Sequence, residues 1–378
     1  MERSPLGGAD AHPELARLRK ELAQLDRGLV ELIGRRGALA ARVAEAKHAA
    51  GLPTRDFGQE REVLERARHA AEAAGADADL AEAALLLLIR DSLGVQERAR
   101  VAAAAGGDGR RALAIGGHGR MGHWFARFLA SQGFAVEVAD PAAPPAGAGW
   151  THRERWEDGP VDHDVIVVAA PLADAGGILE ALATRAPPGL VFDIGSLKGP
   201  VREGLRRLRE RGGRVASLHP MFGPETRLLS GRHVIFADAG VPEATTEARA
   251  LFDQTMAIQV EMGLDEHDRL IAYVLGLSHA VNVAFFTALA GSGEDAPRLA
   301  RLSSTTFDAQ LDVAALVARD NPALYFEIQK LNAFGMESLE ALTDAVSRIR
   351  HAVASGDEAA FQRLMEEGRT YLAMRRAR

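Results

Sequence analysis

The chain has 378 residues, enough for two or three domains that each bury a core. Its composition is 47% hydrophobic and 26% charged, with a net charge of −7, which is typical of a globular protein and argues against nucleic acid as the main partner. The absence of cysteine excludes disulfides, thiolate metal sites and cysteine nucleophiles, and no metal site is expected. Neither a signal peptide nor a membrane partner is expected, because the longest apolar run, Ala83 to Ile89, is far shorter than the ~20 residues of a membrane span. We expect a cytoplasmic protein.

Residues 13–47 are predicted to form one long helix, because apolar side chains recur at alternating spacings of three and four. Arg36 takes a position in this apolar seam where leucine is expected. A buried cation is costly without an anionic partner, so Arg36 either pairs within the bundle or binds an anionic ligand. The seam comprises Leu15, Leu18, Leu22, Leu25, Leu29, Leu32, Leu39 and Val43.

Two more helices follow a break at Gly51-Leu52-Pro53. Asp56 is the predicted N-cap of a helix that runs to about Ala74. A third helix, at about residues 80–100, carries Ser92 and Gln96 on the stripe where core residues are expected. The three helices are predicted to enclose a polar pocket for a small polyanion, lined by Arg36, Lys47, Glu60, Ser92 and Gln96.

The spacing of these polar residues resembles the all-helical chorismate mutase family over about residues 14–100. The resemblance is carried by Leu18-Arg19-x-x-Leu22, Arg35-Arg36, Lys47, Arg55-Asp56-x-x-x-Glu60 and Asp91-Ser92-x-x-x-Gln96. It implies that Arg19, Arg36 and Ser92 bind the two carboxylates of the substrate. It also implies that Lys47 and Gln96 bind the ether oxygen, and that Asp56 and Glu60 hold the ring hydroxyl region.

The chorismate mutase reaction is a Claisen rearrangement, which moves no proton. The pocket therefore has to hold one conformer of the substrate and to place hydrogen-bond donors at the ether oxygen, which gains negative charge. Arg19 and Arg36 are 17 residues apart, about 25 Å along one helix, so one small substrate cannot reach both from the same chain. Arg19 is therefore expected to serve the site of a partner in a homodimer. The family has arginine where this chain has Gln59, from which weaker or altered mutase activity is expected.

A glycine-rich turn follows a short linker at residues 103–109. A strand at residues 112–115 leads into Gly117-x-Gly119-x-x-Gly122, the spacing that lets backbone amides approach a dinucleotide pyrophosphate. Arg120 and Met121 lie in the same turn and are expected at the cofactor. A glycine-rich turn without a ligand is the alternative. Asp140 ends the next strand about 20 residues on, and no lysine or arginine follows before Arg153, which favours NAD over NADP.

Further strands are predicted at residues 164–170, 189–196, 214–219 and 233–239, in alternation with helices. This order predicts a parallel, doubly wound sheet of the Rossmann type, whose ligands gather at the carboxyl ends of the strands. Those ends carry Ser196, Lys198 and His219, and a histidine there is suited to acid or base chemistry. The alternatives are a strand-capping histidine, a helix N-cap and a surface cation.

The segments Asp193-Ile-Gly-Ser-Leu-Lys-Gly-Pro200 and His219-Pro-Met-Phe-Gly-Pro-Glu225 resemble the prephenate dehydrogenase family. The resemblance implies that His219 accepts the proton of the ring hydroxyl while the ring carbon gives a hydride to NAD and carbon dioxide leaves. Ser196 would bond the same hydroxyl or the nicotinamide, and Lys198 would lie near the substrate. The order of the two resemblances is that of bifunctional enzymes of tyrosine biosynthesis.

Beyond about Val241 the pattern predicts helices to the end, as in a substrate and dimerisation domain. The dehydrogenase resemblance implies that His267 and His279 lie near the site. From the pattern alone His267 reads as helix-start polarity and His279 as a core histidine, and the neighbouring Val274 and Val281 are expected to be buried. Related enzymes supply an arginine to the side-chain carboxylate from a later helix. This chain has Asp308 and Leu316 there, and Arg319, on the same face as Leu316, is the expected substitute.

The sequence thus predicts three domains: an all-helical mutase domain at 1–105, a nucleotide-binding domain at 106–240 and a helical domain at 241–378. The expected function converts chorismate to prephenate and prephenate to 4-hydroxyphenylpyruvate. Two alternatives remain open: the same chemistry on 4-amino-4-deoxy analogues, and a regulatory protein that kept the scaffold without catalysis.

Overall fold

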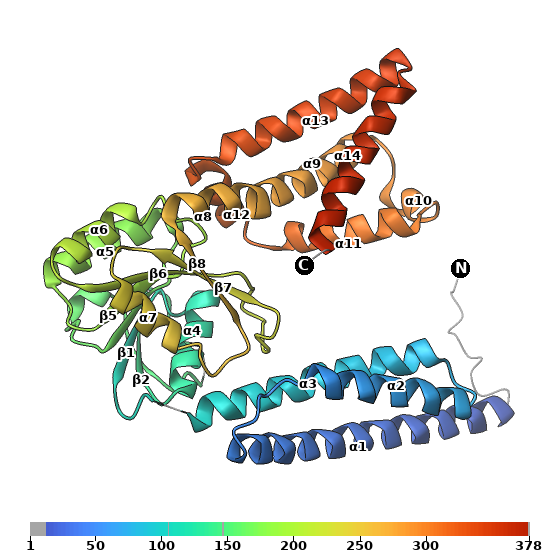
Figure 1. Cartoon of the computed structure of the whole chain (residues 1–378), viewed down its shortest axis with the longest axis horizontal. Helices are drawn as coiled ribbons and strands as arrows, with labels where there is room; N and C mark the ends of the chain where they lie inside the picture. The colour runs from blue at the N-terminus through green and yellow to red at the C-terminus, as the bar shows by residue number, and fades with distance from the viewer. Residues whose placement is uncertain (1–12, 105, 146, 377–378) are drawn as a thin grey trace, which may run out of the picture.

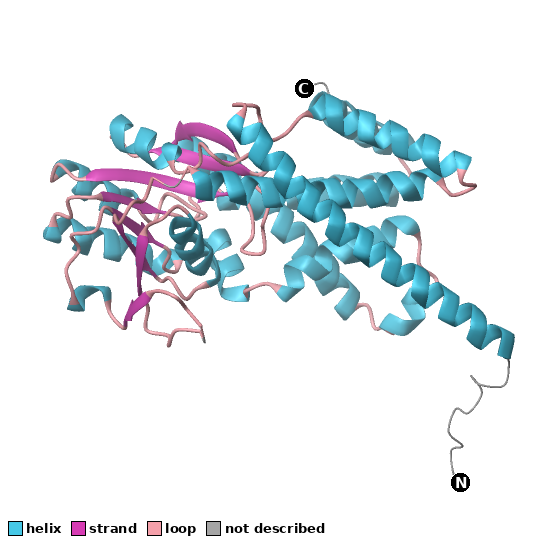
Figure 2. Ribbon diagram, turned by 90° about the horizontal axis from the view of Figure 1, so that it is seen from below, coloured by secondary structure: helices cyan, strands magenta, loops and turns pink. Residues whose placement is uncertain are grey.

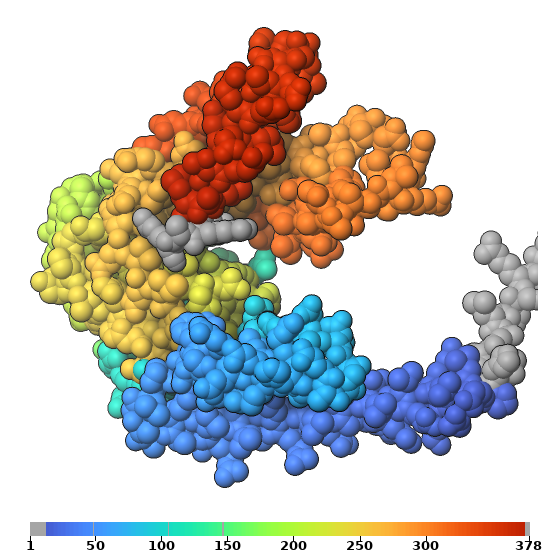
Figure 3. Space-filling view, turned by 45° about the vertical axis from the view of Figure 1, so that its right-hand side comes forward, coloured from blue at the N-terminus to red at the C-terminus, as the bar shows by residue number. Residues whose placement is uncertain are grey.

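A computed structural model describes residues 13–104, 106–145 and 147–376, which fold into an α/β domain and two helical domains that extend from it in the same direction (Figure 1). The N-terminal segment considered for a signal peptide lies outside the described residues. Both helical domains project from the central domain, and a wide opening lies between them in the space-filling view (Figure 3).

The N-terminal domain consists of α1 (Pro13–Ala49), α2 (Phe57–Ala73) and α3 (Ala78–Ala103), with α3 packed on both of the others. The break after α1 is made by Gly51, whose φ of 65° suits a residue without Cβ, and by the nearby Pro53. The predicted N-cap of α2 is confirmed, since the Asp56 carboxylate accepts the amide of Gln59 at 3.0 Å. The long helix is confirmed too, but much of its leucine seam faces solvent, with Leu25 67% exposed.

The central domain is an eight-stranded sheet with strand order β3-β2-β1-β4-β5-β6-β7-β8. The strands are β1 (Arg111–Ile115), β2 (Ala135–Ala139), β3 (Thr151–Arg153), β4 (Val165–Val168), β5 (Leu190–Asp193), β6 (Arg214–Pro220), β7 (His233–Asp238) and β8 (Ile258–Gly263). Its helices are α4 (Arg120–Ser131), α5 (Leu172–Arg185), α6 (Arg202–Glu210) and α7 (Pro242–Ala250), with a short 3-10 turn, η1 (Trp156–Asp158).

Helices cover both faces of this sheet, as the doubly wound prediction requires (Figure 2). The first core lies under α4 and α7 and contains Phe125 and Phe252, whereas the second lies under α5 and α6 and contains Leu179 and Leu205. The strands β1, β2 and β4 to β6 are parallel, and β1 sits in the middle with β2 and β4 on either side. The glycine turn after β1 therefore opens at the reversal of strand order, where such sheets bind ligands.

Two features of the sheet differ from the prediction. β7 pairs with β6 in the antiparallel direction, so the sheet is not wholly parallel. β8 lies beyond Val241, where only helices were expected, and it carries the sheet to Gly263. The pattern of β8 was hard to recognise because this edge strand is largely half-buried or exposed and lacks a continuous apolar run.

The C-terminal domain is helical: α8 (Leu264–Ile271) passes through a π-helical turn, η2 (Ala272–Leu277), into α9 (Ser278–Gly291). It continues with α10 (Ala296–Ala300), α11 (Thr305–Arg319), α12 (Pro322–Leu331), α13 (Gly335–Ser355) and α14 (Glu358–Arg376). The prediction that Val274 and Val281 are buried is wrong, because they are 54% and 38% exposed on an apolar face that the described residues leave uncovered. Helix Leu264–Gly291 is 28 residues long and contains an 18-residue stretch with a mean hydropathy of 1.6, which by length and composition alone would also suit a membrane span.

Candidate active sites

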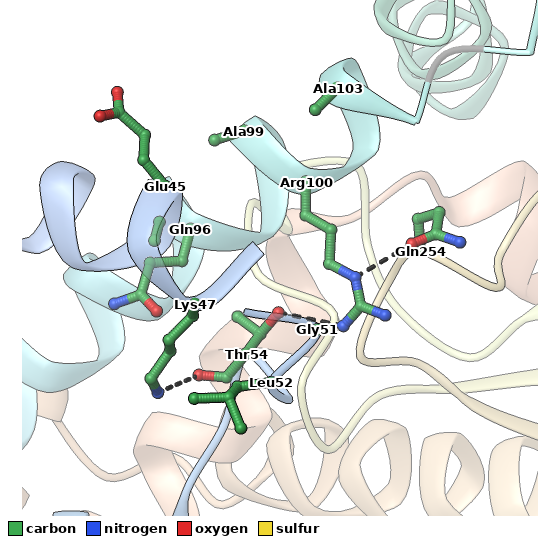
Figure 4. Close-up of a pocket in the computed structure, with 11 residues that line it drawn as sticks. Glu45, Lys47, Gly51, Leu52, Thr54, Gln96, Ala99, Arg100, Ala103 and Gln254 are labelled. Carbon is green, nitrogen blue, oxygen red and sulfur yellow. Dashed lines mark hydrogen bonds between the residues drawn. The ribbon is translucent and has the colours of Figure 1, made fainter. Parts of the chain in front are cut away.

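The first candidate site is a pocket of about 270 Å³ at the end of the N-terminal domain that meets the central domain (Figure 4). Lys47 from α1 and Gln96 from α3, two of the predicted mutase residues, line it together. The Lys47 ammonium donates to the carbonyl of Thr54 at 2.9 Å, in the connection between α1 and α2. Gln96 is only 8% exposed, and its side-chain oxygen has no hydrogen-bond partner in the described residues. The pocket therefore offers a cation and an uncommitted amide.

The other predicted mutase residues lie farther along the helices. Arg36 donates to the Ser92 hydroxyl at 2.5 Å and to the Leu88 carbonyl at 2.7 Å, so the seam arginine meets α3 rather than a carboxylate. Glu60 is held by the Arg55 guanidinium through two hydrogen bonds of 2.9 Å.

Two of the predicted residues are exposed. Asp56 caps α2, and Arg19 lies near the far end of α1, away from Arg36 as the helix length requires. Within one chain the structure thus joins Lys47 with Gln96 and Arg36 with Ser92, and leaves Arg19 apart.

The second candidate site begins at the glycine turn between β1 and α4. A Cβ at Gly122 would collide with the Gly116 carbonyl, and one at Gly117 would lie 2.7 Å from the Val138 side chain. The turn is therefore shaped by backbone that tolerates no side chain at these positions, and Gly119 begins α4 as its N-cap. A helix N-terminus behind a bare backbone turn is suited to a pyrophosphate.

Asp140 follows β2 beside this turn and is 8% exposed. Its carboxylate accepts the amide of His118 at 2.9 Å and that of Ala142 at 2.8 Å, which ties the turn to the strand end. A carboxylate has further lone pairs, so a ribose hydroxyl can still donate to it. The cradle and the acid together fit the pyrophosphate and a ribose of a dinucleotide, and Gly117, Gly119, Gly122 and Asp140 are the residues that would hold it. Met121 packs against the core below this turn.

A chain of three side chains leads away from the end of β6. His219 Nδ1 lies 2.9 Å from His267 Nε2, and His267 Nδ1 lies 2.8 Å from the carboxylate of Asp268. Asp268 also accepts the amides of Lys198 and Gly199, at 2.8 and 2.7 Å. His267 is fully buried and bonded to His219, so its interpretation as simple helix-start polarity is wrong.

The hydrogen bonds among His219, His267 and Asp268 determine which nitrogens of the two imidazole rings carry protons. The Asp268 carboxylate only accepts, so His267 carries its proton on Nδ1, its Nε2 accepts, and His219 donates from Nδ1. The Nε2 atom of His219 then presents a lone pair and makes no hydrogen bond to the described residues. Burial, with help from His267 and Lys198, holds the pKa of His219 well below its usual value, so the imidazole is neutral.

Burial also lowers the pKa of His267, against the opposing effect of Asp268. Burial alone would raise the pKa of Asp268, but hydrogen bonds from His267 and from two backbone amides bring it below its ordinary value. The resulting arrangement of a carboxylate and two neutral imidazoles prepares His219 to act as a base.

The expectation that Lys198 lies near the substrate is wrong. Its side chain is 0% exposed and donates to Asp193 at 2.8 Å and to the Leu218 carbonyl at 2.6 Å, so it cannot reach a substrate. Asp193 also accepts the hydroxyl of Ser217 at 2.5 Å. The buried pair braces the ends of β5 and β6 and so positions His219. Ser196, between β5 and this lysine, is half-buried, and its hydroxyl makes no hydrogen bond to described residues.

The other predicted substrate ligands, His279 and Arg319, lie in the C-terminal domain. His279 in α9 is half-buried and its ring centroid lies 4.0 Å from that of Tyr325, while its Nδ1 is buried without a partner in the described chain. Burial lowers the pKa of His279. Arg120, expected at the cofactor, instead forms an exposed ion pair of 2.8 Å with Asp320. The neighbouring Arg319 is exposed at the end of α11.

Sequence reasoning did not identify Asp268, Arg55 or Arg100 as site residues. Arg100 was detectable, since it follows Gln96 by four residues and so lies on the same face of α3. Asp268 could not be assigned, because its partners Lys198 and Gly199 are about 70 positions earlier in the chain.

Family models match the chain in three consecutive blocks. Chorismate mutase type II matches residues 18–97, the nucleotide-binding domain of prephenate dehydrogenase residues 143–257, and the prephenate dehydrogenase dimerization domain residues 264–367. The T-protein of Enterobacter agglomerans is 25% identical over 351 residues, which cover 92% of this chain and 90% of that protein. A 4-amino-4-deoxyprephenate dehydrogenase of Streptomyces pristinaespiralis is 31% identical over 278 residues, covering 69% of this chain and 91% of that one.

A solved structure shares the fold of the central and C-terminal domains. Prephenate dehydrogenase from A. aeolicus, in complex with hydroxyphenyl propionate and NAD+, has a TM-score of 0.54 at 19% identity and covers 70% of this chain and 98% of that chain. Fold and sites together define an NAD-dependent oxidoreductase with an isomerase domain of three helices at its N-terminus. The chain belongs to the family of bifunctional chorismate mutase/prephenate dehydrogenases.

Proposed function

We propose that this enzyme rearranges chorismate to prephenate in the N-terminal pocket and oxidatively decarboxylates prephenate at His219, using NAD. The observation that carries the dehydrogenase proposal is the chain His219–His267–Asp268, which leaves a buried, neutral imidazole with a free Nε2 at the end of β6. The mutase proposal rests on Lys47 and the uncommitted amide of Gln96 in one pocket.

In the dehydrogenase reaction His219 Nε2 accepts the proton of the ring hydroxyl. His267 accepts the Nδ1–H of His219, and Asp268 stabilises the positive charge that then develops on the imidazoles. Ser196 orients the same hydroxyl, and His279 with Arg319 contacts the far end of the substrate. NAD, when bound to the glycine turn, supplies the hydride acceptor, with Asp140 holding its ribose. Lys198 and Asp193 take no direct part in the reaction; their buried pair positions His219.

In the mutase reaction Lys47 and Gln96 donate to the ether oxygen as it gains charge, and Arg36 with Ser92 binds one carboxylate. Asp56 and Glu60 contact the hydroxyl side of the substrate, and Arg55 keeps Glu60 in place through two hydrogen bonds. Arg19 reaches the site of the partner, so each pocket is completed by a second copy.

We further propose a homodimer in the cytoplasm. Two apolar surfaces of one chain support it: the seam of α1, where Leu22 and Leu29 are each 60% exposed, and the outer face of η2 and α9. Association of two copies through these faces accounts for the apolar character of Leu264–Gly291 without a membrane. The first turns of this helix carry the buried His267 and Asp268, and Asp268 accepts the amide of Lys198 in the central domain, so this end of the helix packs on the α/β domain.

A second candidate function is the same chemistry on 4-amino-4-deoxy substrates. It is favoured by 31% identity to a 4-amino-4-deoxyprephenate dehydrogenase and by Gln59 and Leu316, neutral residues where arginines are expected. An ammonium substituent on the ring would be repelled less by such a site.

The test supplies purified protein with NAD and either chorismate, prephenate or their 4-amino counterparts. Chorismate loss and NADH absorbance report the two steps. We expect NADH from both chorismate and prephenate, and His219→Asn to abolish it while chorismate is still consumed. NADH from the amino substrates alone would select the second candidate. No NADH with any substrate would leave the regulatory alternative.

A further inference from the structure

The mutase pocket extends beyond the N-terminal domain. Besides Lys47 and Gln96, it is lined by Arg100 near the end of α3 and by Gln254, which belongs to the central domain (Figure 4). One turn of α3 separates Gln96 from Arg100, so both side chains face the same space. The pocket thus lies on a domain junction and takes side chains from both sides of it.

Arg100 is held in a defined orientation. Its Nε donates to the Gln254 side-chain oxygen at 3.0 Å, and one terminal nitrogen donates to the Thr54 hydroxyl at 3.2 Å. Thr54 also accepts Lys47 through its carbonyl, so the two cations flank one residue. These contacts use only part of the donors of a guanidinium and an ammonium.

The pocket has an excess of positive charge. Among the described residues, neither Lys47 nor Arg100 has a carboxylate within ion-pair distance. Glu45, the acid that lines the pocket, is exposed and points away from both cations in Figure 4. Two uncompensated cations indicate an anionic ligand, and the buried, unpartnered oxygen of Gln96 is an acceptor that remains available to a donor group of that ligand.

The junction itself is pinned next to Gln254. Glu97, the neighbour of Gln96, is 4% exposed and accepts two backbone amides of the central domain, from Leu229 at 2.8 Å and Met256 at 2.5 Å. Met256 is two residues after Gln254, so the bonds of Glu97 fix the segment that carries Gln254. The position of the Arg100 guanidinium therefore depends on the docking of the two domains.

We propose that Arg100 binds a carboxylate of the mutase substrate and that Gln254, from the dehydrogenase portion, positions it. The inference rests on the proposed mutase function. Arg100 adds a cation from α3 to the pocket of a chain that has Gln59 where the mutase family has arginine. The mutase pocket is then complete only when it is docked on the dehydrogenase, which gives the fusion of the two enzymes a chemical reason.

The test compares matched variants of the full-length enzyme in the chorismate mutase assay. Arg100→Gln is expected to lower kcat/KM for chorismate about 10- to 100-fold, mainly through KM, because a charged hydrogen bond to the substrate is lost. Arg98→Gln removes the same charge from an exposed position two residues away and serves as the control. Arg100→Lys keeps the positive charge but lacks the paired donors of a guanidinium, so its kcat/KM for chorismate should lie between those of the wild type and Arg100→Gln.

Gln254→Leu tests the contribution from the central domain, with Gln259→Leu as its control. We expect Gln254→Leu to raise KM for chorismate several-fold, and Gln254→Glu to raise it more, because a carboxylate would neutralise Arg100. NADH formation from supplied prephenate and the melting temperature report whether the fold is intact. These two readouts should not change.

The variants test substrate binding by Arg100 and positioning by Gln254 separately. Mutase activity of Arg100→Gln equal to that of Arg98→Gln would overturn the role of Arg100, and an unchanged KM in both Gln254 variants would overturn the positioning role. A drop in melting temperature and in both activities would show a structural role instead. Wild-type enzyme that leaves chorismate unconverted would refute the mutase function itself.

Discussion

Replacement of His267 by leucine isolates the contribution of the histidine chain to dehydrogenase catalysis. His267 does not face the substrate. It accepts the Nδ1–H of His219 at 2.9 Å and donates its own Nδ1–H to the Asp268 carboxylate at 2.8 Å. In the variant, a donor on a side chain that is only 4% exposed loses its acceptor.

The size of the effect follows from that loss. An unsatisfied buried donor costs about 1–3 kcal/mol, and the cost grows as the imidazole becomes charged in the transition state, because Asp268 no longer stabilises it. At about 1.4 kcal/mol for each factor of ten, kcat should fall roughly 5- to 150-fold with little change in KM for prephenate.

The assay is NADH absorbance at saturating NAD and prephenate. His267→Gln keeps an acceptor for His219 and should retain more activity than His267→Leu. His233→Leu, at an exposed position on β7, controls for loss of a histidine. The reasoning fails if folded His267→Leu enzyme turns over within twofold of wild type.

Three other predictions concern stability, cofactor and assembly. Burial lowers the pKa of His219 and His267, so as the pH falls the unfolded chain takes up protons at a higher pH than the folded protein does. The contribution of these histidines to stability should be constant above about pH 6.5 and fall below it. A melting temperature that rises as the pH is lowered from 7 to 5 would contradict this. Gly122→Ala places a Cβ against the Gly116 carbonyl and should weaken NAD binding at least about tenfold in a fluorescence titration, with chorismate mutase activity retained. Leu25→Glu puts a charge into the exposed seam of α1, so sedimentation should show dissociation to monomers, whereas Glu31→Gln should remain a dimer.

The sequence by itself determined the features that depend on local pattern. Seam spacing predicted α1, the Asp56 cap predicted the start of α2, and the glycine spacing predicted the tight turn between β1 and α4. Helical periodicity also placed Ser92 and Gln96 on one inner face. These predictions succeed because each depends on backbone geometry over a few turns of chain.

Only the tertiary structure decided what the polar side chains contact. The sequence predicted Lys198 near the substrate, but the lysine pairs with Asp193 in the interior, and the pattern alone did not distinguish helix-start polarity at His267 from its contact with His219. Arg100 and Gln254 are 154 positions apart in the chain. Burial and pairing of a charge depend on which distant elements pack around it, and no local pattern encodes that.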